Sequence, residues 1–164
     1  MTARFHHAES VALQELYPSD EAGMACIAPG ACLALLAVGG IGRVAVSIGA
    51  VPAVFPVHYA MLDGDVVFRT TRGTNLHGAA RNAVVAFEVD DVDPLYRAGW
   101  SVLVVGTADE ITDDATRARA ERLPLQPRRL GSAGRVMAIR PELVSGRRIL
   151  MAQSSRYRGA PSRP

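Results

Sequence analysis

Residues 67–77, VFRTTRGTNLH, place two arginines, three threonines and one glycine between an apolar β-type run and a short helical pattern. The guanidinium groups of Arg69 and Arg72 match phosphate oxygens, and the threonine hydroxyls can donate further hydrogen bonds. Gly73 allows close approach of the backbone, and a helix that begins at Thr74 adds partial positive charge from its first N–H groups. This spacing fits an anion-binding seat. A solvated turn with paired arginines is the alternative.

The elements around this seat follow from local signals. VPAVFPVHYA (51–60) is a β-type run whose two prolines place it at an edge or a bulge. LDGD (62–65) has the Asp-Gly pair that favours a type I′ hairpin turn, and DVVFRT (65–70) is the returning strand. TNLHGAARN (74–82) is then expected to form a short helix with Thr74 as its N-cap.

The rest of the chain continues as short strands with a few helices inserted. A loop is expected before residue 29, and an acidic corner, DDVDP, after residue 90. Helices are expected near 29–38 and 113–123, and strands at 43–49 and 83–90, at 99–112 as the longest strand signal, and at 135–141 and 142–150 as two separate final strands. Six or so strands linked mostly by hairpin-length loops indicate a mainly β fold with a few short helices, closed into a small barrel.

Length and composition indicate one globular domain, because the chain has 164 residues of which 49% are hydrophobic and 21% charged. We expect this domain to span residues 23–150, after a polar arm at 1–22 and before a disordered Arg-rich tail at 151–164. The net charge of +2 argues against a nucleic-acid partner. The sequence has no lysine, which excludes Schiff-base catalysis and a P-loop.

Cys26 and Cys32 lie in an apolar stretch without CxxC spacing, which predicts buried, reduced thiols in a cytoplasmic protein and no metal site. The uncharged segment from Met24 to Gly42 is 19 residues long. It is interrupted by a proline and several glycines, and the N-terminus has no signal-peptide pattern, so we expect no membrane association.

Several motifs together resemble the pyridoxamine 5′-phosphate oxidase-like flavoproteins. They are PVHY, DVVFRT followed by GT.L, VAFEVDD.DP, GWSV.V.G.A and VSGRRI, and they run from about Pro29 to Ile149. More narrowly, the chain is similar to the actinobacterial branch that also holds nitroimidazole-reductase-like members. The resemblance implies an FMN-binding split β-barrel that forms a homodimer, with FMN at the subunit interface.

The resemblance also implies a set of cofactor contacts. The backbone of Pro56, Val57 and His58 would line the isoalloxazine ring. The other implied contacts are Phe68, Arg69 and Thr70 at the ribityl chain and ring, Thr74, Asn75 and Leu76 at the phosphate with Arg72 beside them, and Trp100 and Ser101 from the partner subunit. Arg147 and Arg148 would lie near the mouth of the active site, where one of them could meet an anionic substrate; a charged edge strand is the alternative.

One position departs from the family pattern, since Asn75 stands where GTKL members have lysine. Asn keeps a hydrogen-bond donor but loses the charge, and charge-assisted bonds are roughly twice as strong as neutral ones. The sequence contains no nucleophile–base pair, so an enzyme of this kind would depend on its cofactor for chemistry. The hypotheses that remain are an FMN-dependent oxidoreductase for a small organic substrate, a reductase that uses deazaflavin (F420), and a non-catalytic flavin-binding module. Pyridoxamine phosphate itself is disfavoured as substrate, since the C-terminus lacks the usual substrate-phosphate motif.

Overall fold

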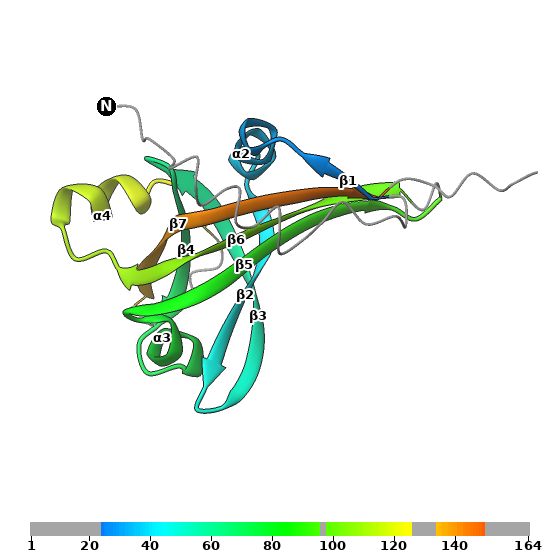
Figure 1. Cartoon of the computed structure of the whole chain (residues 1–164). Coiled ribbons are helices and arrows are strands. Elements are labelled where there is room, and N and C mark those ends of the chain that lie inside the picture. Colours follow the sequence, from blue (N-terminus) through cyan, green and yellow to red (C-terminus); the bar gives the residue numbers. More distant parts are fainter. Residues whose placement is uncertain (1–23, 96–97, 126–133, 150–164) are drawn as a thin grey trace, which may run out of the picture.

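The computed structural model describes residues 24–95, 98–125 and 134–149 (Figure 1). The expected arm at 1–22 and tail at 151–164 therefore lie outside the described residues. Within the described part, the elements in chain order are β1 (Met24–Ile27), α2 (Pro29–Ala37), β2 (Gly40–Ile48), β3 (Val51–Leu62), β4 (Asp65–Thr71), α3 (Asn75–Ala80), β5 (Ala83–Asp93), β6 (Ala98–Glu110), α4 (Asp114–Ala120) and β7 (Gly134–Ile149).

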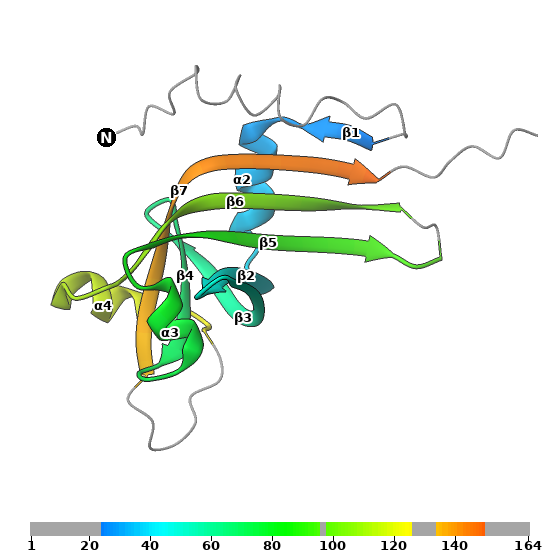
Figure 2. The ribbon, with the colours of Figure 1, turned by 60° about the horizontal axis from the view of Figure 1, so that its bottom comes forward.

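The strands form one antiparallel sheet in the order β1-β7-β4-β3-β2-β5-β6, and β6 also pairs with β7. The second pairing closes the sheet into a six-stranded barrel. β7 can serve both neighbours because its first part, 134–139, pairs with β4, while 137–149 pairs with β6. Where β7 no longer pairs with β4, its free edge pairs with β1, a short edge strand that lies beside β7 in Figure 2.

β3 and β4 pair only near their hairpin, from Leu62↔Asp65 to Tyr59↔Phe68. Beyond Tyr59, β3 continues along β2 alone, and beyond Phe68, β4 continues along β7 alone. The barrel is therefore split between these two strands. Pro52 and Pro56 lie in the part of β3 whose outer side pairs with no described strand, which agrees with the predicted edge position.

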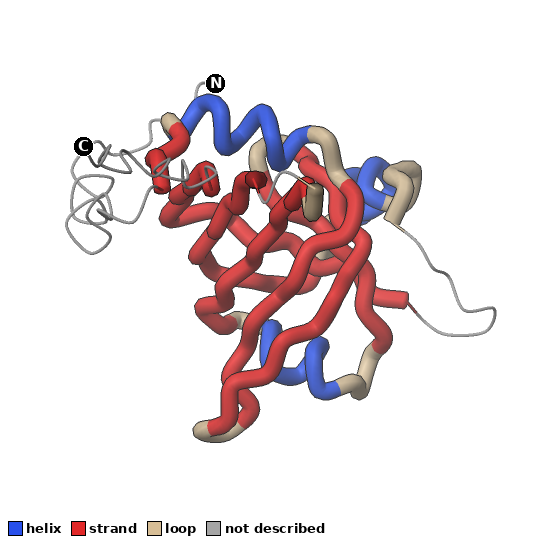
Figure 3. Tube along the Cα trace, turned by 90° about the vertical axis from the view of Figure 1, so that its right-hand side faces the viewer, coloured by secondary structure: helices blue, strands red, loops and turns tan. Residues whose placement is uncertain are grey.

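Two helices pack against the barrel core from opposite sides (Figure 3). Cys32 and Leu36 of α2 and Leu76 and Ala80 of α3 are buried in the main apolar cluster, together with Tyr59, Phe68 and Phe87. α4 covers a second, smaller cluster on the outside of β4 and β7, built from Ala60, Val67, Ala120, Leu125 and Val136. β4 thus has apolar contacts on both of its faces.

The predicted mainly β barrel with a few short helices is confirmed, as are its local turns. Asp63 and Gly64 have φ angles of 54° and 94°, as the type I′ turn requires. Thr74 caps α3, and Asp113 caps α4 by accepting a hydrogen bond of 2.8 Å from the N–H of Thr116.

Three predictions of elements are wrong. The two final strands are one, because Pro141 lies opposite Gly106 where a β-bulge in the β6–β7 pairing accommodates it. This makes β7, with 16 residues, longer than β6. The loop expected before residue 29 contains β1, which exists by pairing with β7, and β5 continues to Asp93, past the expected acidic corner.

The bulge depends on glycine at position 106. A Cβ atom there would lie 1.9 Å from the carbonyl oxygen of Arg140, so the two backbones would have to separate. We expect Gly106→Ala to destabilise the protein by about 2–4 kcal/mol, by analogy with overpacking and backbone strain. Urea unfolding measures the change. Gly30→Ala, where a Cβ meets nothing within 4 Å, is the control and should leave stability unchanged or slightly higher. Equal stability of both variants would contradict this account of the bulge.

Candidate functional site

The residues predicted to bind the cofactor flank the place where β3 and β4 separate. Pro56, Val57 and His58 lie on the β3 side, directly before the Tyr59–Phe68 pair, and Arg69 and Thr70 follow that pair on β4. Pro56 is exposed, His58 is half-buried and Val57 is buried, so the free backbone edge of β3 is the part that a ligand could reach.

Thr74 organises the junction between β4 and α3. Its hydroxyl donates to the carbonyl of Thr71 at 2.8 Å and accepts from the N–H of His77 at 3.3 Å. It also lies 3.1 Å from the hydroxyl of Thr70, which must then be the donor of that bond. Gly73 has a φ of 82°, which glycine adopts without strain. The threonines therefore fix the shape of the loop, and their protons are used within it.

The donors left over for an anion are Arg72 and Asn75. Both side chains are exposed, and neither makes a hydrogen bond or ion pair with other residues in the described part of the chain. They stand on either side of Gly73 and Thr74, at the start of α3, whose first N–H groups have no intrahelical acceptor. The arrangement suits an anion that approaches from solvent.

Three predicted site residues are less accessible. Phe68 is fully buried in the core and Leu76 is 7% exposed. Arg69 points to the face of β4 opposite Thr70, where it donates to the carbonyl of Glu121 at the end of α4 at 3.1 Å. Its Nε is buried without a hydrogen-bond partner. Arg69 thus holds α4, while Thr70 faces α3.

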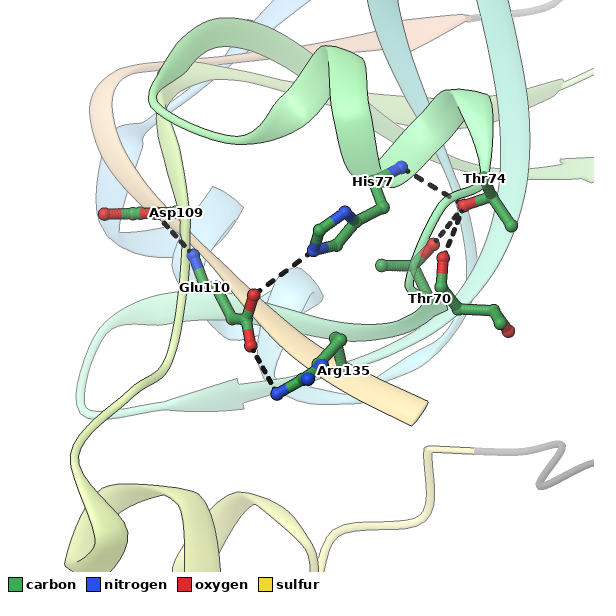
Figure 4. A network of polar contacts seen from close by, with 7 residues as sticks. Thr70, Thr74, His77, Asp109, Glu110 and Arg135 are labelled. Atoms are coloured by element: carbon green, nitrogen blue, oxygen red, sulfur yellow. Dashed lines mark hydrogen bonds and ion pairs between the residues drawn. The ribbon is translucent and has the colours of Figure 1, made fainter. Parts of the chain in front are cut away.

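A polar network beneath the junction was not anticipated from the sequence (Figure 4). The two carboxylate oxygens of Glu110 accept from different elements: Oε2 lies 3.2 Å from His77 Nε2 on α3, and Oε1 lies 3.0 Å from Arg135 on β7. The side chains of His77 and Glu110 are 11% and 17% exposed. His77 is buried beneath the junction. The hydrogen bond from His77, with the charge of Arg135, lowers the pKa of Glu110 below its ordinary value.

The remaining predicted residues lie on β6 and β7. Trp100 pairs with Arg148, and Ser101 pairs with Arg147. Trp100 is half-buried against the core, and Arg148 is exposed. Ser101 and Arg147 are on the outer face, where they line an open cavity of about 230 Å³ with Glu88, Leu103 and Ser145.

Charged residues border this cavity on the neighbouring strands. Arg43 of β2 forms ion pairs with Glu88, at 3.1 Å, and with Asp90. Burial, together with the nearby charge of Asp90, raises the pKa of Glu88 despite its contact with Arg43. The outer face therefore offers serine hydroxyls, an arginine and a carboxylate that is easier to protonate than usual.

The α3 junction and Ser101 lie near opposite ends of β6. Glu110, which contacts α3, is the last residue of the strand, and Ser101 is nine residues earlier. At about 3.3 Å per residue this is roughly 30 Å along the strand.

The remaining observations concern metal ligands, membrane-spanning helices and the two cysteines. Residues 24–95, 98–125 and 134–149 contain no cluster of three or more His, Cys, Asp or Glu side chains that could hold a metal ion. None of the helices in this part of the chain has the length and apolar character that crossing a membrane requires. Cys32 is buried as predicted, but Cys26 is exposed, because it lies on the edge strand β1.

Comparison with known proteins gives a consistent family. The sequence profile described as pyridoxamine 5′-phosphate oxidase matches residues 29–148. An uncharacterised protein of Mycobacterium tuberculosis is 42% identical over 114 residues, which are 66% of this chain and 74% of that protein. The structure of an FAD-binding protein from Mycobacterium smegmatis is 32% identical and covers 78% of this chain and all of its own, with a TM-score of 0.71. A conserved protein of unknown function from Corynebacterium diphtheriae is 27% identical, covers 77% and 98% of the two chains, and has a TM-score of 0.66.

The Glu110 network makes stability depend on pH. Because the pKa of Glu110 is lowered on folding from about 4.5, its ionised form stabilises the protein above pH 4.5, and this stabilisation is lost as the pH falls through the lowered pKa. We expect the urea midpoint of the wild type to fall more steeply below pH 4.5 than that of Glu110→Gln. Glu142→Gln, which alters an exposed carboxylate, should follow the wild type. Parallel curves for the wild type and Glu110→Gln would contradict the network.

Proposed function

The chain belongs to the pyridoxamine 5′-phosphate oxidase family, and we propose that it is a flavin-dependent oxidoreductase that binds FMN at the β4–α3 junction. The observation that carries the proposal is the pair of uncommitted donors, Arg72 and Asn75, on a loop whose shape is fixed by Thr70 and Thr74. A phosphate placed there would receive an arginine fork, an amide donor and backbone N–H groups. The flavin of the Mycobacterium smegmatis relative supports a flavin of some kind.

The ring of the flavin would lie along the free edge of β3 at Pro56, Val57 and His58, on the other side of the β3–β4 separation. A bound flavin supplies the redox chemistry. The protein would hold the phosphate, orient the ring, and present backbone donors and His58 to its edge. Arg147, in the cavity of the outer face, would meet an anionic group of the small organic substrate.

The site would be completed by a second copy of the chain. Ser101 lies near the opposite end of β6 from Glu110, which contacts α3, and a partner would bring its own Ser101 to the junction. The outer face that carries Ser101 also carries an apolar row of adjacent paired residues: Val54, Ala45, Ala86, Val105 and Leu143. An apolar row on an outer sheet face is suited to a subunit interface. We propose a cytoplasmic homodimer that uses this face.

A deazaflavin-dependent reductase and a non-catalytic flavin-binding module are the alternatives. The deazaflavin alternative is favoured by Asn75, because the lost lysine charge weakens the case for FMN. Retention of flavin without reduction of any substrate would favour the binding module.

Flavin binding is tested by incubating the purified protein with FMN, FAD, riboflavin or F420, and recording visible spectra after desalting. We expect retention of FMN, weaker retention of riboflavin, and about a tenfold loss of FMN affinity in Arg72→Ala, since a charge-assisted bond contributes about 1.5 kcal/mol. Asn75→Lys should tighten FMN but not riboflavin. Arg117→Ala, which removes an exposed arginine of α4 paired with Asp114, is the control and should leave FMN affinity unchanged. Retention of F420 alone would favour the deazaflavin reductase, and a colourless protein would refute the proposal.

Sharing of the site between subunits is tested by complementation. Arg72→Asp and Ser101→Phe are each expected to reduce FMN binding, because one reverses the charge at the junction and the other fills the outer face. A heterodimer of the two would contain one site with both defects and one intact site. After co-expression, random pairing should restore about a quarter of the wild-type FMN sites. No restoration in a verified heterodimer would mean that Arg72 and Ser101 do not contribute to one site across the interface.

A further inference from the structure

The carboxylate of Glu110 joins α3 to the paired strands β6 and β7. It ends β6, accepts from His77 on α3, and accepts from Arg135 on β7. One oxygen contacts His77 and the other contacts Arg135, so the loss of either partner leaves one oxygen without this hydrogen bond. The group is largely shielded from water, and such hydrogen bonds to a charged acceptor are stronger than exposed ones.

Each partner of Glu110 is linked to one threonine of the junction. His77 donates its backbone N–H to the hydroxyl of Thr74, and Arg135 is the cross-strand partner of Thr70. The hydroxyls of Thr70 and Thr74 then contact each other at 3.1 Å. Figure 4 shows the contacts that run from Arg135 through Glu110, His77 and Thr74 to Thr70. The backbone pairing of Thr70 with Arg135 connects the two ends of this series.

From this geometry we propose that Glu110 is a positioning residue for the anion seat. It holds the first turn of α3 and the start of β7 at a fixed separation, so that the donors Arg72 and Asn75 are presented on a rigid loop. Glu110 does not touch the anion. This inference rests on the proposed function for its ligand, but its structural part does not depend on flavin.

If Glu110 acted only through its negative charge, it would weaken anion binding instead of supporting it. A carboxylate near an anion site repels the anion, and its removal would leave Arg135 to attract it. Positioning therefore predicts weaker FMN binding when Glu110 is changed to Gln, whereas simple electrostatics predicts stronger binding. The sign of the change separates the two.

The test compares the dissociation constants of FMN and riboflavin, which differ in the phosphate. Glu110→Gln should weaken FMN binding about five- to tenfold, because it removes one charge-assisted hydrogen bond that positions α3. The dissociation constant of riboflavin should not change. His77→Gln, whose amide can still donate to Glu110, should retain most of the FMN preference, and His77→Leu should lose it. Glu142→Gln is the matched control and should bind both as the wild type does. An FMN affinity that is unchanged or higher in Glu110→Gln would overturn the proposal.

Hydrogen exchange of the flavin-free protein supplies a second readout. The amide groups of residues 74–80 should exchange faster in Glu110→Gln than in the wild type, while those of α2 should not change. If the wild type binds no flavin, the proposed function fails, and this measurement still decides whether Glu110 holds α3. Unchanged exchange at 74–80 would overturn the positioning role even if FMN binds.

Discussion

The pairing of β7 with both β4 and β6 is the constraint on which the rest of the structure depends. It closes the barrel, and it requires the chain to pass Pro141 without ending the strand. Gly106 makes this possible by letting the two backbones approach at the bulge. Closure brings Arg135, at the start of β7, beside Thr70 and Glu110. The candidate site is therefore a consequence of long-range pairing, although its ligand donors come from one short loop.

At the split between β3 and β4, successive side chains of β4 point to opposite faces of the strand and therefore have different roles. Phe68 fills the core, Arg69 holds the end of α4 and Thr70 faces α3. The loop after them combines residues that fix its shape, Thr74 and Gly73, with residues that remain free to bind, Arg72 and Asn75. A rigid loop with uncommitted donors loses little entropy when it binds an anion, which favours affinity. The proposed flavin site thus combines preorganisation with exposure.

Local signals in the sequence were sufficient to predict much of the fold. The Asp63–Gly64 turn, the Thr74 cap and the start of α2 at Pro29 all depend on residues within a few positions. β1 and the continuous β7 could not be predicted this way, since both exist through pairing with distant strands. The same holds for Glu110, whose partners are 33 and 25 residues away. The direction of Arg69 could have been inferred, because a core position for Phe68 places residue 69 on the opposite face.

A crystal structure of the protein with FMN would test most directly whether the cofactor binds at the β4–α3 junction. We expect the phosphate at the β4–α3 junction, within hydrogen-bond distance of Arg72 and the N–H groups that begin α3. The ring should lie along the free edge of β3 near His58, with Ser101 supplied by a second subunit. A phosphate bound elsewhere, such as against Arg147 on the outer face, or a ring contacted by one subunit alone, would contradict this expectation.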